Sequence, residues 1–278
     1  IFIKIILDLK KSRIEIMKTK FKSYSKVNID LKVISYLRKI QKHKLNSNIA
    51  ILKLSDDIYI QKSIKNNILY LDGRSKKKLI IQNDIIQKTI KFFDKKYSTK
   101  TSLSIKVIKF IPIGYGLGGG SSNASVVLKY LYKLHSISDS NFDFDSHIIG
   151  SDVCLFKDLM PKKIDGIKSY VALIKPSYRW NNIYLLFPSK KNPTNKIFSL
   201  LKSIPKNTFL STENMSSNDL LLPAMHYNKE MREIILFLKK YYKLFIKYGM
   251  TGSGSGVFII FRTNSYQRSF FNEFKSLF

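Results

Sequence analysis

The sequence predicts an α+β protein of two domains, each built around its own sheet. Segments in which apolar residues alternate, as in strands, occur in both halves of the chain, and segments with helical spacing lie between them. The 278 residues, 44% of them hydrophobic, suffice for one large core or two modest ones. A polar segment with Pro161 and Gly166 interrupts the pattern. We therefore expect a boundary there, between an N-terminal domain at 17–158 and a C-terminal domain at 159–278.

Strand and helix patterns follow one another through the first half. Asn83 precedes a run of apolar residues at helical spacing, which predicts a helix with this residue as its N-cap. A strand that ends at Pro112 leads through a glycine-rich turn into a second helix. The expected strands are 22–37, 49–54, 57–63, 67–72 and 102–113, the expected helices are 83–97 and 121–135, and 145–156 is expected to hold a short helix, a turn and a strand.

The second half repeats the mixture of strands and helices. A second turn rich in glycine and serine, at 249–256, precedes the apolar segment "VFIIF". The expected strands are 168–175, 182–189 and 257–261, and the expected helices are 194–203, 228–242 and 266–277.

The net charge of +30, from 49 Lys and Arg against 19 Asp and Glu, allows two interpretations. A basic protein of this kind can bind nucleic acid or another polyanion. Alternatively, a genome that drifts toward Lys, Ile and Asn spreads lysines over every solvated face. The lysines occur throughout the chain, without a block of five or six. This favours drift, with weak polyanion affinity as a side effect and no specific nucleic-acid partner.

The single cysteine, Cys154, excludes an internal disulfide framework and fits a reducing compartment. The opening "IFIKIILDLKK" is too short and too charged to span a membrane, and no cleavage site follows it. We therefore expect a cytoplasmic protein without a membrane partner. The first Met is Met17, so 1–16 is expected to be an extension outside the fold. The four histidines lack metal-ligand spacing, which predicts no zinc site: His43, His135, His147 and His226.

The segment "IPIGYGLGGGSSNASVVLKYL", at 111–131, holds five of the chain's 12 glycines. It lies between an expected strand and an expected helix, where free backbone N–H groups and the helix dipole favour an anion. Glycines let the backbone approach that anion without steric conflict. The hydroxyls of Ser121 and Ser122 add donors or a metal ligand. One or two glycines would suffice for a tight turn alone, so five indicate a phosphate site.

Several known phosphate-binding and catalytic designs do not fit this segment. No Lys follows the glycines, which excludes a P-loop. Gly114, Gly116 and Gly119 satisfy G-x-G-x-x-G, but the second strand and acidic residue of a dinucleotide fold do not follow. The motifs of protein kinases are missing. Ser121 with His147 and Asp152 could be imagined as a hydrolase triad, but the G-x-S-x-G elbow is absent.

Four motifs in order resemble the GHMP kinases, a family named for galactose, homoserine, mevalonate and phosphomevalonate kinases. They are "SYSKVNIDLKV" at 23–33, "PIGYGLGGGSSNA" at 112–124, "GSDVCLF" at 150–156 and "MTGSGSGVFIIF" at 250–261. The resemblance covers about 21–278. It implies an N-terminal domain like domain 2 of ribosomal protein S5, a ferredoxin-like C-terminal domain, and an active site in the cleft between them.

The resemblance also implies roles for single residues. Asp152 would accept the proton of the substrate hydroxyl, and Lys26 would orient Asp152 and stabilise negative charge. Asn28 would position the acceptor, while Gly252, Ser253, Gly254 and Ser255 would wall the substrate side. ATP with Mg²⁺ is the implied cofactor, with Ser121 or Ser122 near the metal, in a monomer or homodimer. The implied ATP-binding residues are Pro112, Ile113, Gly114, Tyr115, Gly116, Leu117, Gly118, Gly119, Gly120, Ser121 and Ser122.

The triple glycine before Ser121, together with "SSNDLLLPA" at 216–224, is most similar to one branch of the family. Its members phosphorylate the 2-hydroxyl of a cytidyl diphosphate of methylerythritol in the non-mevalonate route to isoprenoids. His43 falls where these enzymes place a His that reads cytosine. Lys42 and Ser216, however, replace the two aromatic residues expected to stack on the base. Candidate substitutes for them are Tyr24, Tyr36 and Phe209.

Three other functions remain open at this stage. The first is another small-molecule kinase of the same family, for homoserine or a sugar. The second is a basic nucleic-acid-binding protein that uses the positive charge. The third is a chain that folds but no longer catalyses, which the intact Lys26, Asn28 and Asp152 disfavour.

Overall fold

The computed structural model describes residues 18–37, 42–166, 172–173, 183–203, 212–263, 265 and 267–277. The expected extension at 1–16 lies outside these residues. Most of the expected strand 168–175 also lies outside them.

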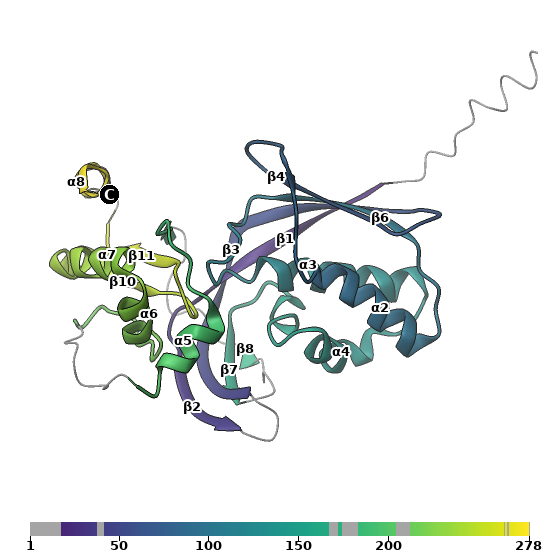
Figure 1. The fold of residues 1–278 in the computed structure, drawn as a ribbon, viewed down its shortest axis with the longest axis horizontal. Coiled ribbons are helices and arrows are strands. Elements are labelled where there is room, and N and C mark those ends of the chain that lie inside the picture. The colour runs from purple at the N-terminus through teal and green to yellow at the C-terminus, as the bar shows by residue number, and fades with distance from the viewer. Residues whose placement is uncertain are drawn as a thin grey trace, which may run out of the picture.

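The larger of two sheets is organised around the long strand β3 (Figure 1). β1 pairs with β3 from Ile49 to Ile60, β2 and β7 pair with its first residues, and β6 pairs with its last. β4 extends the sheet beyond β6 in parallel, and β5 forms its edge. The strands are β1 (Thr19–Asn28), β2 (Lys32–Leu37), β3 (Lys42–Lys62), β4 (Asn67–Asp72), β5 (Lys78–Leu79), β6 (Leu103–Lys109), β7 (Lys162–Gly166) and β8 (Ala172–Leu173).

Three helices cover one face of this sheet: α2 (Ile85–Tyr97), α3 (Gly119–Leu134) and α4 (Phe142–Ile149) (Figure 1). β6 alternates as its sequence predicts, with Leu103, Ile105 and Val107 buried toward the helices. Leu128 and Leu131 of α3 are buried in the same cluster. Burying each such side chain contributes about 1.5–3 kcal/mol, which anchors α3 and thereby the turn that precedes it.

The second half contains a three-stranded antiparallel sheet in the order β10–β11–β9. All five residues of β11 are buried, and the ring of its last residue, Phe261, packs against those of Phe245 and Phe270. The elements are β9 (Ile183–Leu186), α5 (Thr194–Leu200), α6 (Leu221–Tyr227), α7 (Lys229–Lys240), β10 (Phe245–Met250), β11 (Val257–Phe261) and α8 (Gln267–Leu277).

A further apolar cluster joins the two halves. It contains Val27 and Ile29 from the end of β1, Leu117 from the glycine turn, and Phe258 and Ile260 from β11. All five side chains are at most 5% exposed. The end of β1 and both glycine-rich turns are therefore held together by a shared apolar core.

The structure corrects three sequence predictions in the N-terminal half. The strands expected at 49–54 and 57–63 form one strand, β3, because the buried carboxylate of Asp56 accepts backbone N–H groups instead of marking a turn. The strand expected at 22–37 is divided between β1 and β2. The last part of 145–156 is a 3₁₀ helix, η3 (Cys154–Phe156), and not a strand.

The N-cap of α2 is Asp84, one residue later than predicted. Its carboxylate accepts from the backbone N–H of Ile86 at 2.8 Å and from the hydroxyl of Tyr70 at 2.6 Å. Asn83 instead adopts a left-handed conformation with φ 52°. The patterns also missed α6 and β10, while the helices predicted at 194–203, 228–242 and 266–277 correspond to α5, α7 and α8.

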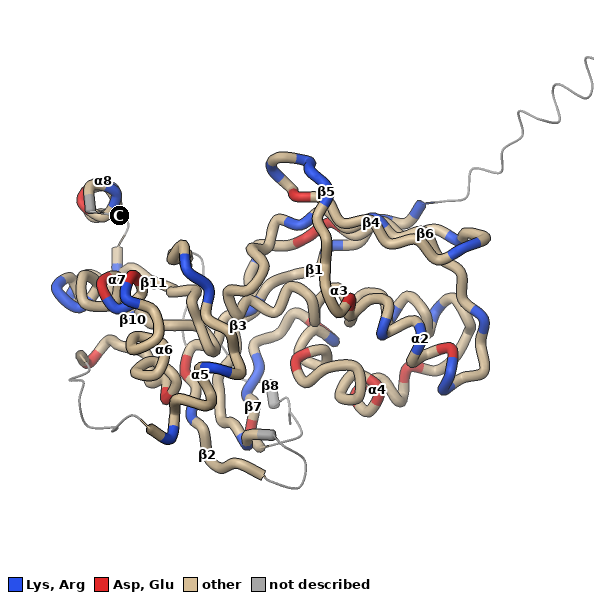
Figure 2. Tube along the Cα trace, in the orientation of Figure 1, with Lys and Arg blue, Asp and Glu red and all other residues tan. Residues whose placement is uncertain are grey.

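β7 lies just beyond the division expected at residues 158 and 159, and it pairs with β3 of the larger sheet. The position of the domain boundary stays a prediction. Lys and Arg are spread over both halves of the described chain, in agreement with the dispersed pattern in the sequence (Figure 2). Among the described helices, none is both long and apolar enough to cross a membrane.

We predict that Asp84→Ala lowers the free energy of unfolding by about 2 kcal/mol. Loss of the cap costs about 1 kcal/mol, and the unpaired Tyr70 hydroxyl costs about as much again. Urea unfolding of the purified protein measures the change. Asn83→Gly is the matched control, with an expected change within about 0.5 kcal/mol because glycine adopts positive φ freely. A larger loss for Asn83→Gly than for Asp84→Ala would contradict the assignment of the cap.

Candidate active site

The glycine-rich turn connects the end of β6 to the start of α3. Gly114, Gly116 and Gly118 have φ of 89°, 73° and 71°, values that side chains with a Cβ rarely adopt. Gly118 is the N-cap of α3, so the free N–H groups of the helix begin at the turn. The turn borders a cavity of about 280 Å³, lined by Tyr70, Ile81, Ile85, Lys109, Ile111, Pro112, Ile113, Gly114, Gly116, Leu117, Gly118, Gly119, Gly120, Ser121 and Asn123.

The two glycine-rich turns, far apart in sequence, are in contact. A Cβ on Gly116 would lie 3.0 Å from the carbonyl oxygen of Thr251, and one on Gly256 would lie 2.8 Å from that of Tyr115. Larger residues at these positions would separate the turns. The sequence predicted both turns, and the structure brings them together beside the end of β1.

Lys26 lies where these elements meet, and its side chain is only 6% exposed. Its ammonium donates to Asn28 Oδ1 at 2.6 Å and lies 3.6 Å from Asp152 Oδ2. Its backbone N–H donates to the carbonyl oxygen of Leu117 at 2.9 Å, which ties the glycine turn to β1. Lys26 and Asn28 are two residues apart on one strand, so their side chains share a face.

Asp152 lies in the short turn between α4 and η3, and its side chain is 36% exposed. The carboxylate of Asp152 is thus partly exposed to solvent and at the same time close to the buried ammonium of Lys26. A hydroxyl placed beside Asp152 would find a carboxylate oxygen that can accept its proton, with the Lys26 ammonium 3.6 Å away. Cys154 nearby is buried, as expected of a packed thiol.

The second glycine turn is fixed by three polar side chains that sequence analysis did not single out. Asn28 donates its backbone N–H to the hydroxyl of Thr251 at 2.8 Å. Asn218 donates to the carbonyl oxygens of Met250 at 3.0 Å and Gly252 at 2.9 Å. The hydroxyls of Thr194 and Ser253 are 2.8 Å apart. Thr251 and Asn218 lie inside the motifs of the resemblance, but only the folded chain shows what they hold.

Gly252 is adjacent to Lys26 and Asn28, because a Cβ on it would lie 3.3 Å from Asn28 Oδ1 and 3.9 Å from Lys26 Nζ. Gly254 and Ser255 continue the same turn, and Ser255 is fully buried. The residues expected on the substrate side are therefore placed beside those expected in catalysis.

The two serines of the turn occupy different surroundings. Ser121 lines the cavity. Ser122 is 1% exposed, and its hydroxyl accepts a hydrogen bond from Ser23 at 2.8 Å. Of the pair, Ser121 therefore faces the space in which a nucleotide and its metal would lie. Among the described residues, no group of three or more His, Cys, Asp or Glu side chains could hold a metal ion without a ligand's help.

An aromatic patch lies around His43, at the start of β3. The ring of Phe198 from α5 stacks on His43 with centroids 4.4 Å apart, and the ring of Tyr36 from β2 lies 4.7 Å away on a tilt of 45°. Lys202 lies over Tyr36. Burial lowers the pKa of His43 and the charge of Lys202 lowers it further, so the imidazole is neutral near pH 7.

Of the aromatic residues that sequence suggested as substitutes, Tyr36 is the one found beside His43. Tyr24 pairs with Ser55, twelve residues along β3 from His43. Phe209 lies outside the described residues. Ser216 is 3% exposed and donates its hydroxyl to the carbonyl oxygen of Ile29, so it faces the interior.

Comparison with known proteins shows similarity to one family throughout the fold. The family model for the N-terminal domain of GHMP kinases matches residues 84–146. A 4-diphosphocytidyl-2-C-methyl-D-erythritol kinase of Ureaplasma urealyticum is 31% identical over 140 residues, 49% of this chain and 52% of that protein. The match therefore spans about half the length of that relative. The enzyme of the same name from Pelagibacter ubique is 29% identical over 279 residues, 93% of this chain and 95% of that protein.

Solved structures share the fold at lower identity. A crystal structure of 4-(cytidine 5'-diphospho)-2C-methyl-D-erythritol kinase has a TM-score of 0.68 with 19% identity, covering 93% of this chain and 96% of that chain. The mevalonate kinase of Methanococcus jannaschii has a TM-score of 0.60 with 14% identity, covering 95% and 96%. The predicted two-domain α+β architecture is therefore confirmed.

We predict that Thr251→Val lowers the free energy of unfolding by about 1–3 kcal/mol, because the buried N–H of Asn28 loses its acceptor while the side-chain volume is kept. Thermal and urea unfolding measure the loss. Thr251→Ser keeps the hydroxyl and removes one methyl group, at about 0.8 kcal/mol. A Thr251→Val protein as stable as the wild type would show that this hydrogen bond does not hold the turn.

Proposed function

We propose that the chain is an ATP-dependent small-molecule kinase of the GHMP family and that it phosphorylates the 2-hydroxyl of 4-diphosphocytidyl-2-C-methyl-D-erythritol. The observation that carries this proposal is the contact of buried Lys26 with Asn28 and Asp152 where the two glycine turns meet. Relatives that match over about nine-tenths of this chain carry the name of that kinase. We further propose a cytoplasmic monomer or homodimer without a nucleic-acid partner.

The glycine turn fits the triphosphate of ATP. Positive-φ glycines and the N-terminus of a 16-residue helix direct N–H groups toward an anion. Apolar side chains of Tyr70, Ile81 and Ile85 line the same cavity and offer a surface for a base. Mg²⁺ bound with ATP would neutralise phosphate charge, and Ser121 is the residue of this turn placed to meet it.

On the acceptor side, Asp152 is proposed to take the proton of the attacking hydroxyl. Lys26, 3.6 Å away, stabilises negative charge on the transferring group. Asn28 holds the Lys26 ammonium at 2.6 Å, and its own amide donates to Ser47 at 2.8 Å. These contacts fix the lysine before any substrate binds, which is the preorganisation that phosphoryl transfer requires.

The aromatic patch is proposed to bind the cytosine. His43 and Ser47 lie on the same face of β3, four residues apart, which is roughly 13 Å along a strand. Ser47 touches Asn28 at the reaction centre. A substrate with its base and its reacting alcohol at opposite ends of a diphosphate linker can span such a distance, whereas homoserine cannot.

The experiment that tests the proposed function is incubation of the purified protein with ATP and, separately, with the cytidyl diphosphate, homoserine and mevalonate. Phosphorylation of the cytidyl diphosphate alone is expected, detected by mass spectrometry of the product. Phosphorylation of homoserine but not of the cytidyl diphosphate would overturn the substrate assignment. Sequence-selective binding to DNA that survives high salt would instead favour a nucleic-acid-binding protein.

We predict that Asp152→Asn folds normally and lowers kcat at least about 100-fold, because the amide cannot accept the proton of the hydroxyl. Lys26→Ala is expected to lose activity likewise, mainly in kcat. Steady-state kinetics with ATP and the cytidyl diphosphate measure both. Asp143→Asn, a change of the same chemistry on the exposed face of α4, is the control and should keep wild-type rates. Near wild-type turnover of Asp152→Asn would overturn the proposed mechanism.

We predict that Phe198→Ala raises KM for the cytidyl diphosphate about tenfold and leaves kcat within about twofold. Stacking on a base contributes about 1–3 kcal/mol, and 1.4 kcal/mol corresponds to a factor of ten in binding. The matched control is Phe144→Ala, which removes an exposed ring on α4. An unchanged KM would place the base elsewhere on the protein.

A further inference from the structure

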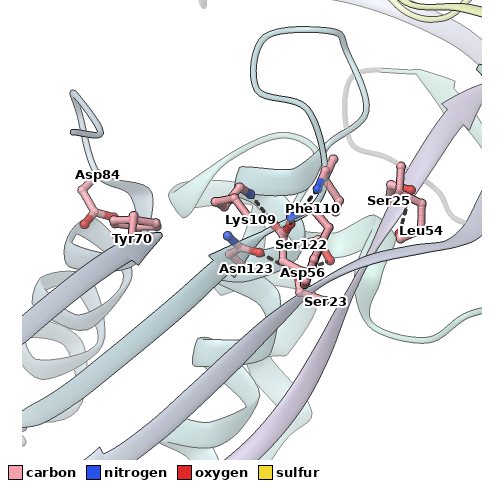
Figure 3. Close-up of polar contacts among 11 residues, drawn as sticks. Ser23, Ser25, Leu54, Asp56, Tyr70, Asp84, Lys109, Phe110, Ser122 and Asn123 are labelled. Atoms are coloured by element: carbon pink, nitrogen blue, oxygen red, sulfur yellow. Dashed lines mark hydrogen bonds and ion pairs between the residues drawn. The ribbon is translucent and has the colours of Figure 1, made fainter. Parts of the chain in front are cut away.

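A second buried lysine, Lys109, lies beside the cavity that the glycine turn borders. Lys109, the last residue of β6, is 7% exposed. Its ammonium forms an ion pair with the carboxylate of Asp56, which is completely buried on β3 (Figure 3). Ionised side chains are rarely buried to this degree unless each is paired with an opposite charge. The ion pair between Lys109 and Asp56 therefore accounts for the burial of both groups.

Asp56 fixes both the lysine and the chain that leads into the turn. One carboxylate oxygen, Oδ1, accepts the backbone N–H groups of Phe110 at 2.8 Å and Ile111 at 2.9 Å. The other oxygen pairs with Lys109. Asp56 thereby accepts from Lys109 and from the backbone N–H groups of Phe110 and Ile111. Because all three donors lie at the end of β6, the carboxylate fixes the position of the Lys109 ammonium relative to the start of the turn.

A chain of polar contacts continues from Lys109 to the serine at the start of α3, and the side chains that make it are labelled in Figure 3. With the amide of Asn123 oriented to satisfy its neighbours, its oxygen accepts from Lys109 Nζ at 3.2 Å and its nitrogen donates to Ser23 Oγ at 2.7 Å. Ser23 in turn donates to Ser122 at 2.8 Å. An ammonium carries three N–H donors. Two of the N–H donors of Lys109 are directed to Asp56 and Asn123.

The remaining donor of Lys109 is beside the cavity. Lys109 lines that cavity, and a Cβ on Gly119 would lie 3.2 Å from its ammonium nitrogen. On the neighbouring residue, a Cβ on Gly118 would lie 3.0 Å from Cγ of Lys26. The first residues of α3 are therefore flanked by two buried lysines, and only glycines leave room for both.

We propose that Lys109 donates its third N–H to a phosphate oxygen of the nucleotide bound in this cavity, with Asp56 as the residue that positions it. This inference rests on the proposed function in one respect, namely that the cavity binds a nucleotide. The role of Lys109 is to hold the donor phosphates against the helix N-terminus, while Lys26 serves the acceptor side.

The experiment compares binding of ADP and of adenosine to the purified full chain by calorimetry. Lys109→Met is expected to weaken ADP binding roughly 10- to 100-fold, as for loss of a hydrogen bond to a charged group. Adenosine, which lacks phosphates, should bind within about threefold of wild type. Equal losses for ADP and adenosine would show that Lys109 only supports the fold of the cavity and would overturn the proposal.

Two further variants distinguish a loss of phosphate binding from a folding defect. Lys109→Met leaves Asp56 buried without its partner, whereas the double variant Asp56→Asn with Lys109→Met replaces the pair by neutral groups of similar size, a change that proteins often tolerate. The double variant should still bind ADP poorly and adenosine normally. Recovery of ADP binding in the double variant would overturn the proposal.

Lys106→Met, on the same strand with its ammonium over Tyr59, removes the same charge and should leave ADP affinity unchanged.

The acceptor plays no part in this measurement, so the two proposals fail separately. ADP binding that depends on Lys109, without phosphorylation of the cytidyl diphosphate, would overturn the proposed substrate and support the role of Lys109. A wild-type protein that does not bind ADP would overturn both.

Discussion

The close approach of the two glycine turns is the constraint on which the candidate active site depends. The backbone of Thr251 lies against Gly116, and Gly252 lies against Asn28, at separations that leave no room for larger side chains. Thr251 and Gly252 of the second half reach Asn28 and Lys26 at this contact. Because Gly116 and Gly252 carry no side chains, backbone atoms of both halves lie close to Lys26, which is 5% exposed.

Enclosing Lys26 has a cost that the surrounding polar groups offset. A buried ammonium requires hydrogen-bond acceptors, and Asn28 supplies one at 2.6 Å while Asp152 supplies charge at 3.6 Å. Asn28 is itself satisfied by Thr251 and Ser47. The same side chains therefore stabilise the junction of the two halves and fix the geometry of the proposed reaction centre, so that a change to the junction also changes that geometry.

Local features of the site could be predicted from the sequence, and contacts between distant segments could not. The glycine turn and helix α3 follow from adjacent residues, and Lys26 and Asn28 share a face because a strand alternates. The sequence predicted two short strands at 49–54 and 57–63, whereas the folded chain has one strand, β3, with Asp56 buried inside it. Its partners are the N–H groups of Phe110 and Ile111, more than fifty residues away, and no local pattern reveals them.

The departure at Ser216 acquires a physical explanation from long-range contacts. A Cβ on Gly249 would lie 2.6 Å from Cβ of Ser216, and the hydroxyl of Ser216 is bonded to Ile29, so that position is filled by the core and cannot present a ring. Rings from two other elements, Tyr36 and Phe198, instead flank His43. Stacking depends on the faces of rings and not on the strand that supplies them. A base-binding surface can therefore persist at this end of the site although the expected sequence positions have changed.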